Sequence, residues 1–316
     1  MIPLELVREL EKQMQSLRIG STLMHRAQKL EKLLGVRRLH LKLECRNPSG
    51  THKDRLALAY ALDARSKGMD TMVAATCGNY GAAVAYVCYK LDMKCRIYIP
   101  SEFVAPRRAE IERMGASVTV APGDYEAAVR ASATDAARNR WYDANAGGPN
   151  KELGVFAYTF VAREIAKDLG RQPDWVSVPV GNGTCIAGIW SGFRSMSMKP
   201  RMLGVSNNNS AVRGVVLGAE KEVPVEDIRI TETNEPLAGN VIFDAEEAMA
   251  AMVESNGGAV EVPDEELIRA AEIIKKEEGL DILPASAGAV WGIKSLDSKN
   301  HVFAAVITGK GHFGGE

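Results

Sequence analysis

The fold of this chain is most constrained by a repeated alternation of short apolar segments with longer segments of helical spacing. Apolar segments typical of strands lie at 71–75, 95–99, 117–121, 175–180, 202–205 and 302–307. Apolar residues recur at the spacing of a helix in seven longer segments, 81–91, 106–114, 124–139, 155–169, 186–196, 245–255 and 264–278. Strands that alternate with helices predict a parallel, twisted sheet with helices on both faces.

A segment rich in glycine and asparagine interrupts this alternation at 145–150, and the same order resumes after it. Before residue 71, helices are expected at 4–17, 25–34 and 54–67, with one strand at 38–44. We therefore predict an α/β protein of two open, twisted domains, with the ligand in the cleft between them. The smaller domain would comprise 44–148, and the larger 1–43 with 149–316. In such sheets, ligands bind beyond the carboxyl ends of the strands.

Composition excludes several classes of function. The chain has 316 residues, 25% of them charged, with a net charge of −1 and no basic patch, so we expect no nucleic-acid partner. No apolar run reaches the roughly 18 residues of a membrane span, and the first residues lack the apolar core of a signal peptide. Five cysteines without a CxxC pair argue against disulfides and a zinc ribbon. We expect a cytoplasmic protein without a metal.

The segment from Asn47 to Arg55 reads Asn-Pro-Ser-Gly-Thr-His-Lys-Asp-Arg, which places Lys53 between a turn and an expected helix. The positive end of a helix dipole disfavours the charged form of a lysine there. A lysine that is partly neutral is a nucleophile towards carbonyl groups and can form a Schiff base.

Glycine-rich loops follow three of the expected strands, at 76–81, 181–185 and 308–311. The backbone amides of 76–81 would bind a carboxylate at the start of a helix. The amides of 181–185, together with the Thr184 hydroxyl, suit a phosphate group. The loop at 308–311 follows the final expected strand and would also face the cleft.

These loops lack the signatures of nucleotide sites. The loop at 181–185 has no Gly-Lys-Ser/Thr of a Walker A motif, and no GxGxxG with a distant acidic residue indicates a dinucleotide site. A phosphate site without a nucleotide signature, combined with a candidate Schiff-base lysine, indicates pyridoxal 5'-phosphate as the cofactor.

The chain also resembles a known family. Residues 47–55 resemble the Asn-Pro-Thr/Ser-Gly-Ser-x-Lys-Asp-Arg motif of the fold-type II pyridoxal-phosphate enzymes. The loop at 77–79 is similar to their Ser-Ser-Gly-Asn loop, and the loop at 181–185 to their phosphate-binding loop. Within that family, 178–193, 284–287 and 308–311 look like segments of threonine synthase.

The resemblance implies a role for each matched residue. Lys53 would bind the cofactor covalently and then carry the α-proton, Asn79 would bond the ring hydroxyl, and Thr308 would face the pyridine nitrogen. A neutral hydroxyl at that nitrogen would favour elimination and replacement over transamination. The cofactor phosphate would be held by Gly181, Asn182, Gly183, Thr184 and Cys185. The substrate would be bound by Thr76, Cys77, Gly78 and Tyr80 and by Lys151.

The chain departs from threonine synthase where that enzyme holds the substrate phosphate. An arginine is expected in the Asn-Pro-x-Arg-x-x-Gly-Gln-Lys-Thr segment, and here its place is taken by Lys151. Arginine and lysine are not interchangeable at a bidentate phosphate site. Thr184 replaces a glycine, and Lys310 replaces a histidine.

Several functions therefore stay open. The first is a lyase or synthase that acts on a β- or γ-substituted amino acid, as threonine synthase acts on O-phosphohomoserine. The alternatives are a cysteine-synthase-like β-replacement, a serine/threonine deaminase, and a non-catalytic sensor that binds an amino acid or the cofactor. The partner is expected to be a small amino-acid substrate, and the family suggests a homodimer.

Overall fold

The computed structural model describes residues 2–76, 78–101, 106–297 and 300–311, and these fall into two compact units. Unit 1 comprises residues 2–21 and Arg46–Ala157, and unit 2 comprises Thr22–Cys45 and residues 158–311. Helix α7 (Lys151–Leu169) contains the border between the two units. The predicted domain borders remain a prediction; the first 21 residues, expected in the larger domain, group with unit 1.

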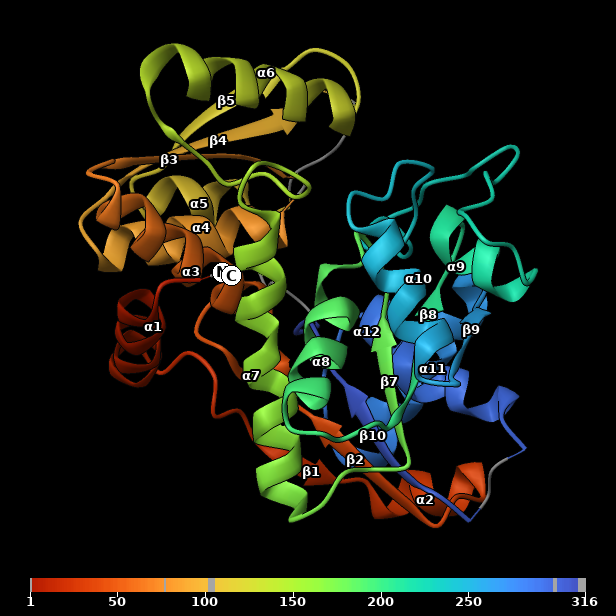
Figure 1. Ribbon diagram of the computed structural model, residues 1–316. Coiled ribbons are helices and arrows are strands. Elements are labelled where there is room, and N and C mark those ends of the chain that lie inside the picture. The colour runs from red at the N-terminus through yellow and green to blue at the C-terminus, as the bar shows by residue number, and fades with distance from the viewer. Residues whose placement is uncertain (1, 77, 102–105, 298–299, 312–316) are drawn as a thin grey trace. The chain divides into compact units, whose positions relative to one another are not determined.

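Unit 1 is built on a parallel sheet of four strands in the order β5-β4-β3-β6. The strands are β3 (Thr71–Ala75), β4 (Lys94–Pro100), β5 (Ser117–Ala121) and β6 (Tyr142–Asp143). The helices are α1 (Leu4–Leu17), α3 (Lys53–Ser66), α4 (Asn79–Lys90), α5 (Arg108–Arg113) and α6 (Tyr125–Asn139). Figure 1 shows α6 on one face of this sheet and α4 on the other. Every residue of β3 is buried, as expected for a parallel strand covered on both faces.

Unit 2 is built on a sheet of six strands in the order β1-β2-β10-β7-β8-β9. The strands are β1 (Met24–Arg26), β2 (Arg38–Lys42), β7 (Trp175–Pro179), β8 (Arg201–Ser206), β9 (Gly258–Glu261) and β10 (Val302–Val306). Only the β1–β2 pair is antiparallel, and the remaining neighbours are parallel. Because β10 and β7 are neighbours, the loops that follow them lie at the same edge of the sheet.

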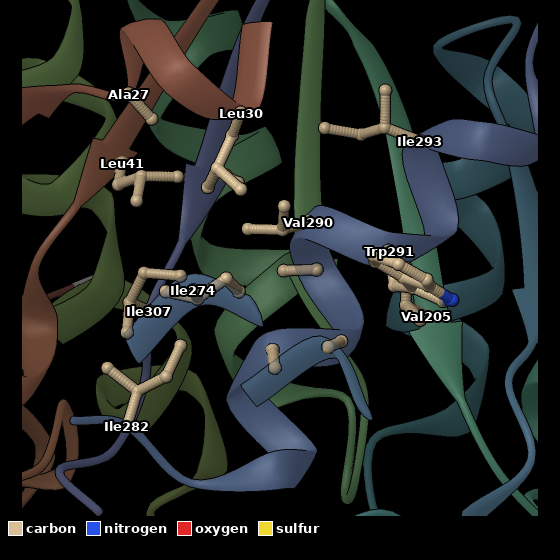
Figure 2. Packing of buried hydrophobic residues seen from close by; sticks show 14 of the residues in the cluster. Ala27, Leu30, Leu41, Val205, Ile274, Ile282, Val290, Trp291, Ile293 and Ile307 are labelled. Atoms are coloured by element: carbon tan, nitrogen blue, oxygen red, sulfur yellow. The ribbon is translucent and has the colours of Figure 1, made fainter. Parts of the chain in front are cut away.

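Helices cover both faces of the second sheet. They are α2 (Gln28–Leu34), α8 (Thr184–Ser195), α9 (Ser210–Val216), α10 (Ala245–Glu254), α11 (Asp264–Glu278) and α12 (Pro284–Trp291), and a 3₁₀ turn, η2 (Gly292–Ser295), follows α12. Along β8, a Cβ at Gly204 would meet Met252 of α10, whereas Val205 packs against the glycines of α12 and η2. Figure 2 shows the core on the α12 side, where Leu41, Ile274 and Val290 come together.

The predicted elements differ from the structure in two instructive places. Helical spacing was expected from residue 25, but Met24–Arg26 pairs with β2 as a strand and the helix begins at Gln28. The helix Pro284–Trp291 was not predicted, because all but its first residue are buried and it therefore has no polar face. Over the part of the chain that the structure describes, no helix combines the length and apolar character that crossing a bilayer requires.

Close packing between α8 and α7 gives a test of this arrangement. A Cβ added at Gly192 of α8 would lie 2.6 Å from the Thr159 carbonyl oxygen and 2.8 Å from the Ala162 Cβ. We expect Gly192→Ala to lower the free energy of unfolding by about 1–3 kcal/mol, because overpacking outweighs the better helix propensity of alanine. Urea unfolding followed by circular dichroism measures the difference.

Gly258→Ala is the matched control, since no described atom lies within 4 Å of the added Cβ. We expect that variant to change the free energy by less than about 0.5 kcal/mol. Equal stability of Gly192→Ala and the parent protein would contradict the described packing of α8 on α7.

Candidate active site

Lys53 is the first residue of α3, at the end of a closed turn in unit 1. The Gly50 N–H donates to the Asn47 carbonyl oxygen at 2.8 Å, and Gly50 has a φ of 80°, which favours glycine. The predicted position of this lysine, after a turn and at a helix start, is therefore confirmed.

The turn is locked from inside the helix by Asp54. The Ser49 N–H donates to Asp54 Oδ2 at 2.8 Å, and the Ser49 hydroxyl donates to Asp54 Oδ1. Both residues are buried, and Asp54 has no exposed surface. A carboxylate in the first turn of a helix is also favoured by the helix dipole. Asp54 thus fixes the backbone that carries Lys53, a role that the sequence interpretation did not assign to it.

The loop after β3 is organised by the Thr76 hydroxyl. Thr76 Oγ1 accepts from the Gly78 N–H and from the Gly81 N–H, both at 3.1 Å. The helix α4 then begins at Asn79. Two amides of the loop are therefore engaged within it. Cys77, predicted to bind substrate, lies outside the described residues.

Two further residues predicted to bind substrate have structural contacts in unit 1. Tyr80 is buried, and its hydroxyl donates to the Ala144 carbonyl oxygen at 2.5 Å, which joins α4 to the segment after β6. Lys151 is half-buried at the start of α7, and its N–H donates to the Gly148 carbonyl oxygen at 3.2 Å. Binding of substrate by Tyr80 and Lys151 stays a prediction.

In unit 2, the loop after β7 forms a tight entry to α8, which begins at Thr184. Gly183 has a φ of 89°, and a Cβ there would lie 2.6 Å from the Asp244 carbonyl oxygen. The side chain of the fully buried Asn209 donates to the Gly181 carbonyl oxygen at 3.1 Å and so fixes the loop. The first N–H groups of a helix have no partner within it, so this end of α8 presents donors to an anion.

The Thr184 hydroxyl has a hydrogen-bond partner within unit 2. It donates to the carboxylate of the buried Asp244, whose N–H in turn donates to the Asn182 carbonyl oxygen at 3.0 Å. Binding of the cofactor phosphate by Thr184 and by the amides of this loop stays a prediction. Cys185, the second residue of α8, is buried.

Thr308 follows β10, the neighbour of β7, and its hydroxyl oxygen lies 2.9 Å from the hydroxyl oxygen of Ser286. The Gly309 N–H donates to Ser286 Oγ at 2.9 Å. Ser286 is fully buried on α12, so this chain of hydrogen bonds fixes where the Thr308 hydroxyl lies. The sequence interpretation quoted the segment of Ser286 for its resemblance but assigned it no role.

Each unit, taken by itself, carries groups that suit a part of pyridoxal phosphate. Unit 1 has a lysine amine on a fixed turn and an amide side chain at a helix start. Unit 2 has a glycine-rich loop with helix amides and a threonine hydroxyl held by a serine. Among the described residues, no group of three or more His, Cys, Asp or Glu side chains is placed to hold a metal ion.

Comparison with known proteins agrees with this chemistry. Residues 15–309 match the model of the family described as pyridoxal-phosphate dependent enzyme. The chain therefore belongs to that family, and its cofactor is pyridoxal phosphate, as predicted.

Threonine synthases are among its curated relatives. The chain is 31% identical to that of Methanocaldococcus jannaschii over 299 residues, which cover 90% of this chain and 72% of the relative. It is also 31% identical to that of Bacillus sp. (strain ULM1) over 309 residues, which cover 94% of this chain and 84% of the relative.

Solved structures confirm the predicted fold. The threonine deaminase of T.th. matches with a TM-score of 0.81 at 20% identity, and the match covers all of both chains. An O-ureido-L-serine synthase matches with a TM-score of 0.77 at 22% identity and covers 93% of this chain and 90% of its own. The fold is the α/β fold of the fold-type II enzymes, with two open sheets.

The lock between Ser49 and Asp54 makes a testable prediction. Asp54→Ala removes both acceptors and leaves the Ser49 N–H buried without its carboxylate. We expect the free energy of unfolding, measured by urea titration of the protein without cofactor, to fall by about 3 kcal/mol.

Asp70→Ala is the control for this measurement, because Asp70 pairs with Lys94 at the surface with 70% of its side chain exposed. Exposed ion pairs contribute about 1 kcal/mol or less. If the free energy of unfolding falls by the same small amount in both variants, the turn is not held by Asp54.

Proposed function

We propose that the protein is a pyridoxal-phosphate-dependent lyase or synthase that acts on a β- or γ-substituted amino acid, with a threonine synthase-like reaction. The observation that carries this proposal is the lysine at the start of α3 in a chain about 30% identical to threonine synthases over most of its length. In that reaction, O-phosphohomoserine and water are converted to threonine and phosphate.

The cofactor, when bound, withdraws electrons from the substrate so that its α-proton can leave. Lys53 would attach the cofactor and then take and return that proton, because its amine is carried on a turn fixed by Asp54. Backbone amides of the loop that contains Thr76 and Gly78 would hold the substrate carboxylate. Since two of these amides already donate to Thr76, the remaining ones at the start of α4 would bind it.

The other cofactor contacts would come from Asn79 and unit 2. The Asn79 amide would donate to the ring hydroxyl, and the loop from Gly181 to Cys185 would hold the phosphate with its amides. Thr308 would place a neutral hydroxyl at the pyridine nitrogen, with Ser286 behind it at 2.9 Å. A neutral partner there favours elimination and replacement over transamination.

The leaving group of the substrate is the finer part of the proposal. Lys151 begins a helix of 19 residues, where a cation and helix amides together suit a phosphate group. The amine of Lys151 lacks the planar, bidentate geometry of the arginine expected at this position. A β-replacement and a serine/threonine deamination are therefore the alternatives, and the fold is shared with an O-ureido-L-serine synthase and a threonine deaminase.

The location, the assembly and the partner of the protein are proposed from its family. We propose a cytoplasmic homodimer whose partner is a small amino acid and which binds neither nucleic acid nor a membrane. Balanced charge, with 39 basic against 40 acidic side chains, supports the part of this proposal that excludes a nucleic-acid partner.

The role of Lys53 is tested by the visible absorbance of the protein after incubation with pyridoxal phosphate and removal of the excess. We expect the band of the Schiff base between lysine and cofactor, at a longer wavelength than the band of free pyridoxal phosphate. It should be present in the parent protein and in Lys94→Ala, whose lysine is exposed in a surface pair. Lys53→Ala should lack the band, because it lacks the amine that joins the cofactor. A band of equal height in Lys53→Ala would overturn the assignment.

The substrate is tested by incubating the holoprotein with O-phosphohomoserine, O-phosphoserine, O-acetylserine with sulfide, and threonine. We expect phosphate and threonine from O-phosphohomoserine at a rate at least about tenfold above the turnover of the other three. Consumption of sulfide would instead indicate β-replacement, and a keto acid from threonine would indicate deamination. No turnover of any of them by a coloured holoprotein would favour the sensor.

A further inference from the structure

Arg107 is a buried arginine of unit 1 to which neither the sequence motifs nor the proposed reaction assigns a role. It lies between β4 and α5, and only 2% of its side chain is exposed. Its guanidinium group meets side chains and backbone from three separate segments. A buried arginine has to be paired and fully hydrogen-bonded, since an unpaired buried charge is costly.

One of its contacts is with Asn79. Arg107 Nη1 donates to Asn79 Oδ1 at 3.0 Å across 28 positions of the sequence. A second contact reaches the lysine turn, where Arg107 Nη2 donates to the Ser49 carbonyl oxygen at 2.7 Å. Glu110 accepts two hydrogen bonds, at 2.9 Å from Nε and 2.7 Å from Nη2, and balances the charge.

The chemistry of the guanidinium group determines the orientation of the Asn79 amide. All guanidinium nitrogens donate and none accepts, so Asn79 has to turn its oxygen towards Arg107. The NH₂ group of the amide then faces the other way with its two donors. Without the arginine, a rotation of the amide by about 180° would exchange oxygen and nitrogen at little steric cost.

We propose that Arg107 is a positioning residue, which fixes the Asn79 amide so that its NH₂ group faces the ring hydroxyl oxygen of the cofactor. An ionised ring hydroxyl only accepts hydrogen bonds, so it is matched by the amide NH₂ and repelled by the amide oxygen. The inference rests on the proposed contact between Asn79 and the cofactor and adds the residue that sets its polarity. Arg107 also bonds the Ser49 carbonyl oxygen, but the turn that carries Lys53 is closed by Asp54, so the effect of Arg107 on the cofactor passes through Asn79.

The test is a double-mutant cycle on the dissociation constant of pyridoxal phosphate, measured by titrating the protein without cofactor. We expect Arg107→Met to raise that constant about tenfold and Asn79→Ala to raise it by a similar factor. The double variant should be no more than about twofold weaker than Asn79→Ala alone, because Arg107 acts through the amide that is absent.

Arg108→Met is the matched control, since Arg108 is half exposed and bonds Glu112 at the surface at 2.9 Å. It should bind the cofactor within about twofold of the parent protein. Circular dichroism of each variant without cofactor checks the fold. If Arg107→Met does not fold, Arg107→Lys replaces it: lysine keeps the charge beside Glu110 but has no fork to reach Asn79 and Ser49 together, and the same coupling is expected.

The outcomes separate this inference from the function on which it rests. If Asn79→Ala leaves the dissociation constant unchanged, the contact between Asn79 and the cofactor is wrong. If Asn79→Ala weakens binding but Arg107→Met does not, or if the two losses multiply in the double variant, the contact stands and the role of Arg107 is refuted.

Discussion

A single buried carboxylate holds the part of the molecule on which its chemistry depends. Asp54 accepts both hydrogen bonds of Ser49 and thereby closes the turn that brings the chain to Lys53. Burial of this charge is tolerated because two donors and the start of a helix surround it. The carbonyl group of the same serine is then bonded by Arg107, which reaches on to Asn79. The lysine and the asparagine are therefore placed by one network of polar contacts.

In unit 2, the loop proposed to hold the phosphate is fixed by backbone geometry rather than by a buried charged side chain. Its strands β7 and β10 are parallel neighbours, so the loops that follow them are adjacent at one edge of the sheet. Gly183 admits the close approach of Asp244, and Asn209 supports the loop from below. A glycine loop fixed in this way leaves helix amides as the donors proposed for the phosphate, and residues 181–185 include no basic side chain.

Much of this could be predicted from the sequence because it is local. The strand and helix order follows from hydrophobic spacing, and the position of Lys53 follows from a turn next to a helix. The strand Met24–Arg26 was missed since its partner β2 decides its conformation. The contacts of Arg107 with Asn79 and Ser49, and that of Ser286 with Thr308, could not be predicted. They join residues 22 to 58 positions apart, and nothing in the spacing marks them.

The central claim is that Lys53 is the residue to which the cofactor is joined. Reduction of the holoprotein with borohydride, followed by peptide mass spectrometry, tests it most directly. The account predicts one added cofactor mass per chain, on the peptide that contains Lys53. Modification of another lysine with Lys53 unmodified, or no modification at all, would contradict it.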